Sequence, residues 1–178
     1  MCPDTGQLVS CTQRWDSPNY WVQIFDARGK HMKTIPVEFE RKGIIHDLQI
    51  TENYVIIFYA PAFHSLERAM KGEDPFMWEP ELGTKVIVIP RDGSGKPIVF
   101  ETDAFFSWHY CNGFEQGGKI IIDYVWISSI PFTTAQGSGV EKQPRRMHRM
   151  TLDLATKKVT DELFSDVFCE FSRVDERR

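Results

Sequence analysis

Two histidines of this chain stand among residues that suggest a buried setting. His46 lies in the middle of GIIHDLQI (43–50), and His109 follows the aromatic run AFFSW (104–108). The β-branched, aliphatic and aromatic residues of both runs predict buried strands. A buried imidazole needs a partner for each ring nitrogen; a metal ion can supply one and a carboxylate the other. His46 and His109 are therefore candidate metal ligands.

The residues alone leave a simpler interpretation open, in which both histidines are core residues whose nitrogens bond backbone carbonyls. Neighbouring side chains of a strand point to opposite faces, so we expect Asp47 to point away from His46 and not to share a metal with it. The remaining histidines are predicted to be surface residues: His31, His64 and His148.

Composition excludes several classes of protein. The chain has 178 residues, of which 42% are hydrophobic and 13% aromatic, enough for a core. Its 25 acidic and 21 basic residues give a net charge of −4 without a basic stripe, so no nucleic-acid partner is expected. The 4 cysteines form no C-x-x-C pair and no signal peptide is evident, which favours a cytoplasmic protein. Membrane contact is possible but not indicated, because the apolar runs are too short to span a bilayer.

The pattern of elements predicts an all-β fold with one short helix. The helix is expected at SLERAMKG (65–72), with Gly72 as its C-cap, and the polar stretch 133–146 as a surface loop. Strands are expected at residues 20–25, 31–39, 43–50, 54–60, 84–90, 97–101, 104–111, 119–127, 148–154 and 158–164.

One type of turn recurs along the chain. FDARGK, PRDGSGK and LDLATKK each place an aspartate (Asp26, Asp92 and Asp153) between two predicted strands, at intervals of about 60 residues. Such a repeat is typical of β-propeller blades, each a small antiparallel meander. No change of composition divides the chain, so we predict that residues 1–178 form a single partial β-propeller domain.

Four segments, in this order and spacing, resemble the carotenoid cleavage oxygenases. They are GIIHDLQITENYVII (43–57), DPFMWEPELGTKVIVIPRDGSGKPIVFE (74–101), FFSWHYCNGFEQGGKIIIDYVW (105–126) and EFSRVD (170–175). The resemblance implies a seven-bladed β-propeller of which this chain would form about three blades. The N-terminal and C-terminal blades are then expected to lie outside it.

The resemblance also implies a cofactor, since enzymes of that family hold Fe(II) on the propeller axis with four histidines. The histidine of the family's I-H-D motif is His46 here, and that of its H-x-x-N-x-x-E motif is His109, followed by Asn112 and Glu115. In the family's E-F-P-R motif, the glutamate hydrogen-bonds a ligating histidine and so fixes its tautomer. That residue is Glu170 here.

This chain departs from the family pattern in two ways. Ser172 stands where the family has proline, which frees a backbone angle close to Glu170. The first family ligand is expected immediately upstream of the chain and the fourth far beyond Arg178, so only two of four ligands are present. We therefore expect the isolated chain to be a fragment without dioxygenase activity.

The activity implied is the cleavage of a conjugated C=C bond by O2 into two carbonyl products. The substrate would be a carotenoid, an apocarotenoid or a stilbene-like phenolic compound. The charged segment 66–82 favours a soluble phenolic substrate. Candidates for an aromatic substrate tunnel are Phe76, Trp78, Phe105, Phe106 and Trp108, although core packing is the simpler interpretation.

Two other classes of function compete with this one. A non-catalytic β-propeller that binds another protein would use His46 and His109 only for packing. A hydrolase built on His46 and Asp47 is disfavoured, because no nucleophile elbow or glycine-rich phosphate loop accompanies them.

Overall fold

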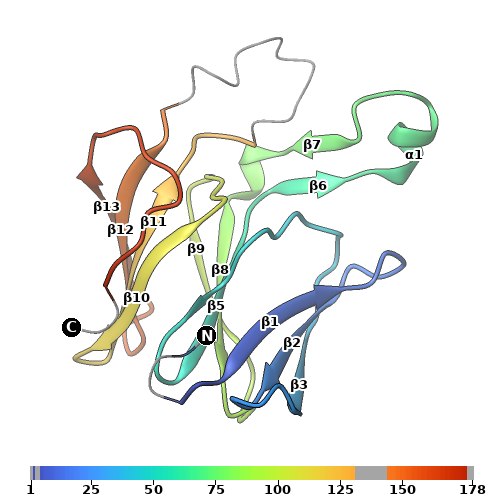
Figure 1. Cartoon of the computed structure of the whole chain (residues 1–178). Coiled ribbons are helices and arrows are strands. Elements are labelled where there is room, and N and C mark those ends of the chain that lie inside the picture. Colours follow the sequence, from blue (N-terminus) through green and yellow to red (C-terminus); the bar gives the residue numbers. More distant parts are fainter. Residues whose placement is uncertain (1, 3–4, 131–143, 176–178) are drawn as a thin grey trace.

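The computed structural model describes residues 2, 5–130 and 144–175 (Figure 1). These residues form three antiparallel sheets of three, four and four strands and a separate two-stranded ribbon. Consecutive segments of the chain build each large sheet, and the sheets follow one another in space as they do in the sequence (Figure 1).

The first two large sheets are built from successive segments of the chain, residues 8–37 and 49–102. Sheet β1-β2-β3 consists of Leu8–Gln13, Tyr20–Phe25 and His31–Val37. Sheet β4-β5-β8-β9 consists of Gln49–Ile50, Tyr54–Tyr59, Thr84–Pro90 and Ile98–Thr102. The ribbon of β6 (Ala62–His64) and β7 (Phe76–Trp78) is inserted between β5 and β8 and carries helix α1 (Leu66–Met70) at its far end (Figure 1). A 3-10 turn, Pro80–Leu82, leads back into the sheet.

The third large sheet has the order β10-β11-β12-β13. Its strands are Tyr110–Gln116, Lys119–Trp126, Arg146–Asp153 and Val159–Ser165. β11 pairs along its whole length with β12, from Lys119 opposite Asp153 to Trp126 opposite Arg146. The segment after β13 then runs back past β10 (Figure 1).

The core lies between the sheets, and strands β5 and β8 of the middle sheet are buried on both faces. Alternate residues of β5 and β8 pack against opposite neighbours, because successive side chains of a strand point to opposite sides. One set packs with the third sheet: Ile56, Phe58, Val86 and Val88, against Ile120, Ile122, Tyr124, Met150 and Leu152. The other packs with the first sheet: Val55, Ile57, Ile87 and Ile89, against Tyr20, Val22 and Ile24. Burial on both faces explains why these strands read as continuous apolar runs.

The repeated aspartate turns have the same place in every sheet. Asp26 and Asp92 lie just after the penultimate strand of their sheets, and Asp153 is the last residue of the penultimate strand of its sheet. Each accepts hydrogen bonds from backbone N–H groups two to four residues on. These side chains stabilise the connection to the last strand of the sheet. The recurrence confirms the expectation of repeated meanders.

Two predicted strands are wrong, and both carry a candidate histidine. Residues 43–48 and 104–109 contribute only isolated bridges, from Gly43 to Phe63 and from Phe106 to Ile127. Their apolar side chains are buried in the clusters between sheets (104–109) or partly buried against them (43–48), so the composition resembles that of a strand although no ladder forms. The pattern also missed β1, β6, β7 and most of β10.

Helix α1 is shorter than predicted but has the expected ends. The Ser65 hydroxyl accepts a hydrogen bond from Arg68 N at 3.3 Å, and Gly72 has a φ of 72° just beyond the C-cap. No helix in the described ranges is long and apolar enough to cross a membrane. The loop predicted at 133–146 falls mainly outside the described residues, and its last residue, Arg146, begins β12.

Candidate functional site

The two candidate ligands precede the first strands of neighbouring sheets. His46 lies three residues before β4 and His109 directly before β10. Their ring centroids are 5.2 Å apart and their planes meet at 84°, so the rings are arranged edge to face. His46 also contacts Trp108, with centroids 5.0 Å apart. The fold therefore brings together two imidazoles that are far apart in the sequence.

His46 was predicted to be buried, but the structure places it at the surface. Its ring contacts Trp108 and His109, yet the residue is exposed. The segment that carries it forms no strand and pairs only through the bridge from Gly43 to Phe63, so the burial expected for a strand does not apply to it. An imidazole in such a position remains accessible to a ligand.

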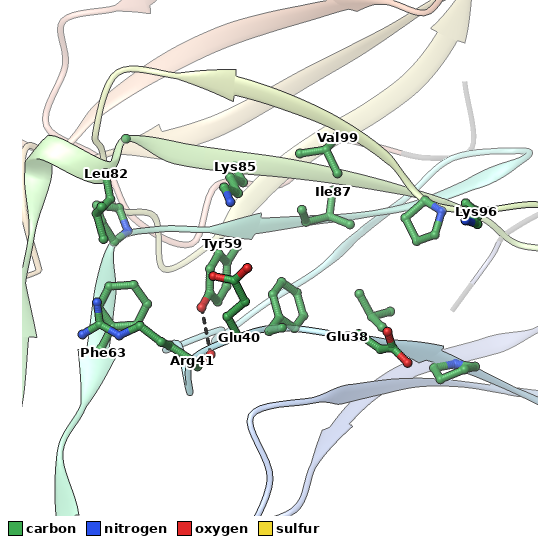
Figure 2. A pocket seen from close by; sticks show the side chains of 16 residues that line it. Glu38, Glu40, Arg41, Tyr59, Phe63, Leu82, Lys85, Ile87, Lys96 and Val99 are labelled. Carbon is green, nitrogen blue, oxygen red and sulfur yellow. Dashed lines mark hydrogen bonds between the residues drawn. The ribbon is translucent and has the colours of Figure 1, made fainter.

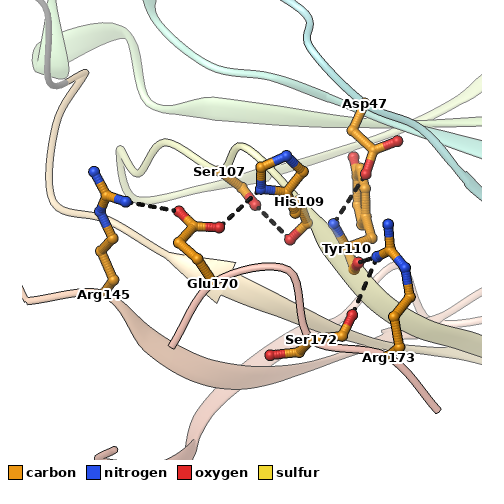
Figure 3. Close-up of polar contacts among 8 residues, drawn as sticks. All are labelled: Asp47, Ser107, His109, Tyr110, Arg145, Glu170, Ser172 and Arg173. Carbon is orange, nitrogen blue, oxygen red and sulfur yellow. Dashed lines mark hydrogen bonds and ion pairs between the residues drawn. The ribbon is translucent and has the colours of Figure 1, made fainter. Parts of the chain in front are cut away.

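His109 is held by Glu170 from the segment that follows β13. Its Nδ1 lies 2.8 Å from Glu170 Oε2, and the two side chains are only 15% and 12% exposed (Figure 3). In the neutral tautomer that donates from Nδ1, Nε2 keeps its lone pair for a metal ion. The structure thus brings together the histidine and the glutamate that the resemblance paired.

Arg145, directly before β12, lies on the other side of Glu170. Its Nη1 is 3.4 Å from Glu170 Oε1 (Figure 3). That oxygen is buried and accepts no hydrogen bond from the described residues, so the contact is an ion pair whose geometry is too poor for a hydrogen bond. Sequence reasoning missed Arg145, because it assigned this stretch to a surface loop.

Phe171 has an unusual backbone conformation next to Glu170. Its φ is 54°, in the left-handed region that bulky residues rarely adopt, and its ring centroid lies 4.2 Å from that of His109. Phe171 therefore covers one face of the His109 ring. The serine at position 172 does not prevent Glu170 from reaching the histidine.

Asp47 contacts the His109 segment instead of pointing away from the site. Its Oδ2 accepts a hydrogen bond from Tyr110 N at 3.2 Å (Figure 3). The prediction of opposite faces was wrong here, because residues 43–48 do not form a strand and alternation does not apply to them.

The motif residues Asn112 and Glu115 have structural roles in this fold. Asn112 Oδ1 accepts a hydrogen bond from Gly113 N. Glu115 accepts three hydrogen bonds, from Thr51 Oγ1 at 2.5 Å, Asn53 N at 2.7 Å and Asn53 Nδ2 at 2.9 Å. It therefore anchors the β4–β5 turn to β10.

The aromatic candidates divide into two groups. Phe105, Phe106 and Trp108 are buried in the clusters between sheets. Phe76 and Trp78, on β7, are only partly buried. Packing is thus the role that the structure gives Phe105 and Phe106, whereas Trp108 also contacts His46.

The other histidines lie away from this site. His31 and His64 are exposed, as predicted. The surface prediction was wrong for His148, whose side chain is 17% exposed and bonds Asp161 through Nδ1 at 3.1 Å. It stacks on Trp126 with centroids 5.2 Å apart, since both side chains share one face of the third sheet.

Two cavities of the described surface have neither His46 nor His109 in their walls. A cavity of about 630 Å³ is lined by Asp47, Tyr110 and Arg173, among others. Another, of about 620 Å³, lies between the end of β3 and strands β8 and β9, with Tyr59, Phe63 and Ile87 in its wall (Figure 2). The second cavity contains neither His46 nor His109.

The donor set fits part of a metal site. The described residues contain no group of three or more His, Cys, Asp or Glu side chains that could hold a metal ion. They do contain two imidazoles in edge-to-face contact, one of them oriented by a carboxylate through Nδ1. This arrangement fits two ligands of a shared ion.

Comparisons with known proteins agree with the sequence resemblance. The family model for the retinal pigment epithelial membrane protein, RPE65, matches residues 1–178. The chain is 31% identical over 185 residues to an isoeugenol monooxygenase of Pseudomonas nitroreducens, covering 98% of this chain and 39% of the relative. It is 30% identical over 158 residues to an apocarotenoid-15,15'-oxygenase of Synechocystis, covering 82% and 31% of the two chains.

Solved structures confirm the predicted propeller-type fold. A lignostilbene dioxygenase of Pseudomonas brassicacearum matches 98% of this chain with a TM-score of 0.86 and 26% identity. Cobalt-substituted Synechocystis ACO matches 93% with a TM-score of 0.82 and 26% identity. The chain covers 39% and 36% of these structures, so it spans well under half the length of the proteins it matches.

Proposed function

Because the chain belongs to the RPE65 family, that of the carotenoid cleavage oxygenases, we propose that it forms part of an Fe(II)-dependent enzyme that cleaves a conjugated C=C bond with O2. The observation that carries the proposal is the pairing of His46 and His109, 5.2 Å apart, with Glu170 on Nδ1 of His109. A packing role for the histidines needs neither the exposure of His46 nor this carboxylate.

The residues of this chain would supply two of the iron ligands and their orientation. His46 and His109 would bind the metal through neutral imidazoles, and Glu170 would hold the His109 proton on Nδ1. Arg145, as a cation beside Glu170, would keep that carboxylate in place. Bound iron(II) would supply the activation of O2, and each oxygen atom of O2 would end in one of the two carbonyl products.

The substrate class follows from the relatives. The names of two matched proteins refer to isoeugenol and to lignostilbene, in which an alkene is conjugated to a phenol ring. We propose a phenolic alkene of this kind as the substrate, with an apocarotenoid as the second choice because of the Synechocystis relative. The whole enzyme would require segments that this chain does not contain.

The test uses the longest native polypeptide that contains this chain, loaded with Fe(II) without oxygen. Isoeugenol, resveratrol and an apocarotenal are then offered in turn under ¹⁸O2, and aldehyde products are identified by mass spectrometry. We expect ¹⁸O-labelled aldehydes from a phenolic alkene. His46→Ala and His109→Ala should abolish both iron binding and turnover.

His31→Ala is the matched control, since His31 is exposed and lies on the first sheet. This variant should keep its iron and its activity. Wild-type turnover in His46→Ala and His109→Ala would contradict the proposal. Absence of both iron and turnover in the native polypeptide would favour a protein that binds a partner through its propeller.

A further inference from the structure

We propose that Asp47 is a positioning residue that sets the spacing between the His46 and His109 rings. Asp47 Oδ1 accepts a hydrogen bond from Leu48 N at 2.9 Å, and Oδ2 accepts one from Tyr110 N at 3.2 Å. Asp47 directly follows His46, and Tyr110 directly follows His109. One carboxylate therefore joins the two histidine-bearing segments at the residues adjacent to the histidines.

The Tyr110 N–H group needs such a partner. β10 is the first strand of its sheet and, among the described residues, pairs with β11 on one side only. On the free edge of a strand, N–H groups have no neighbouring strand to bond, and a carboxylate is a strong acceptor for one of them. The bond also fixes the place of Asp47, because Tyr110 is part of a regular sheet.

Tyr110 is itself held from two further directions. Its hydroxyl accepts a hydrogen bond from Phe58 N in the middle sheet at 2.8 Å, inside the core. Its carbonyl oxygen accepts one from Arg173 Nη1 at 3.3 Å, and Arg173 belongs to the same segment as Glu170 (Figure 3). The segments of His46, His109 and Glu170 thus meet at one anchored residue.

The His46 segment depends on this contact more than a strand would. At one end Ile44 N bonds Ala62 O, and at the other pairing with β5 begins only at Gln49. Between these points Asp47 supplies a side-chain bond to the neighbouring sheet. Without it, an exposed histidine on an irregular segment would sample a wider range of positions.

The experiment measures ring spacing without any metal. In the full 178-residue chain with ¹³C-labelled histidine, the His46 and His109 ring protons should show a nuclear Overhauser effect (NOE). We expect this NOE to be lost in Asp47→Ala and the exchange of the Tyr110 amide to accelerate. Asp47→Asn preserves the side-chain volume but has one acceptor oxygen instead of two, so it should weaken the NOE. If Asp47→Ala does not fold, Asp47→Asn takes its place in the experiment.

Asp26→Ala is the matched control, because Asp26 Oδ1 also accepts two backbone N–H groups, at 2.9 Å each, but on the distant β2–β3 turn. This variant should keep the NOE. A wild-type NOE in folded Asp47→Ala, or the absence of any NOE in the wild-type chain, would overturn the positioning role.

The functional meaning of the spacing rests on the proposed metal site, so Co(II) titration of the same substitutions forms a separate arm, carried out in the longest native polypeptide that contains this chain. We expect Asp47→Ala to weaken Co(II) binding about tenfold, as loss of an outer contact of a metal site does. If that wild-type polypeptide binds no Co(II) while the NOE results hold, the proposed metal site is wrong and the positioning role stands. Equal Co(II) affinity in wild type and Asp47→Ala would show that the metal does not depend on Asp47 and would overturn its part in the site.

Discussion

Gly113 of β10 passes so close to Gln49 of β4 that a Cβ atom at position 113 would lie 2.4 Å from Gln49 Cγ. The first strands of the second and third sheets, each following a candidate ligand, are thus packed without room for a methyl group. This close approach lies between the two strands that directly continue the histidine segments. A larger residue must push the strands apart or displace the glutamine.

We therefore expect Gly113→Ala to destabilise the fold by about 1–3 kcal/mol, the usual cost of overpacking. The measurement is urea denaturation followed by tryptophan fluorescence. Gln49→Ala should recover most of the loss in the double variant, because it removes the atoms that the new Cβ would meet. Equal stability of wild type and Gly113→Ala would show that the two strands are not so tightly packed.

Glu170→Gln should weaken metal binding about 10-fold or more, in the range typical of an outer partner of a ligating histidine. The amide is uncharged and no longer forms an ion pair with Arg145, and its NH2 group competes for the place of the acceptor. Isothermal titration with Co(II) provides the measurement. Glu162→Gln, an exposed change on β13, is the control and should bind as the wild type does. Unchanged affinity in Glu170→Gln would separate this carboxylate from the metal.

Glu115→Ala should lower the free energy of unfolding by about 2 kcal/mol, because three donors of the β4–β5 turn lose one shared acceptor. Hydrogen exchange should accelerate at Asn53 N, whereas the NOE between the two histidines should persist. Glu101→Ala, on an exposed position of β9, provides the reference for a surface change. Loss of the NOE in Glu115→Ala would instead place this glutamate in the histidine site.

Stability should depend on pH through Asp161, whose pKa is raised by partial burial, with the His148 hydrogen bond opposing that shift. A carboxyl group with a raised pKa in the folded state contributes most below its ordinary pKa of about 3.9, and this contribution is lost as pH rises through the folded-state pKa. Asp161→Asn should therefore increase Tm more at pH 7 than at pH 4. Differential scanning calorimetry at both pH values tests this.

Asp166→Asn, which changes an exposed aspartate just beyond β13, controls for net charge. It should change Tm little at either pH, because an exposed carboxylate contributes little to stability. A larger gain in Tm at pH 4 than at pH 7 in Asp161→Asn would contradict a raised pKa of Asp161 in the folded state.

The strands that carry the core could be predicted from the sequence. β2 and β8 have the predicted bounds, because β-branched and aromatic residues bounded by turn signals mark a strand. In β2 every second residue is buried, and in β8 most residues of both faces are. The aspartate turns revealed the repeat for a similarly local reason, since Asp26, Asp92 and Asp153 bond backbone groups within four residues. The family resemblance could also be recognised from the sequence, because it is carried by four motifs in a fixed order.

Only the tertiary structure decided how the site is assembled. The sequence by itself determined the candidates His46, His109 and Glu170, but the bond from Tyr110 to Asp47 spans 63 residues and that from His109 to Glu170 spans 61. No local pattern encodes such contacts, because they depend on how whole sheets pack. The same reason explains why an apolar segment around His46 looked like a strand: packing between sheets and pairing within a sheet select the same residue types.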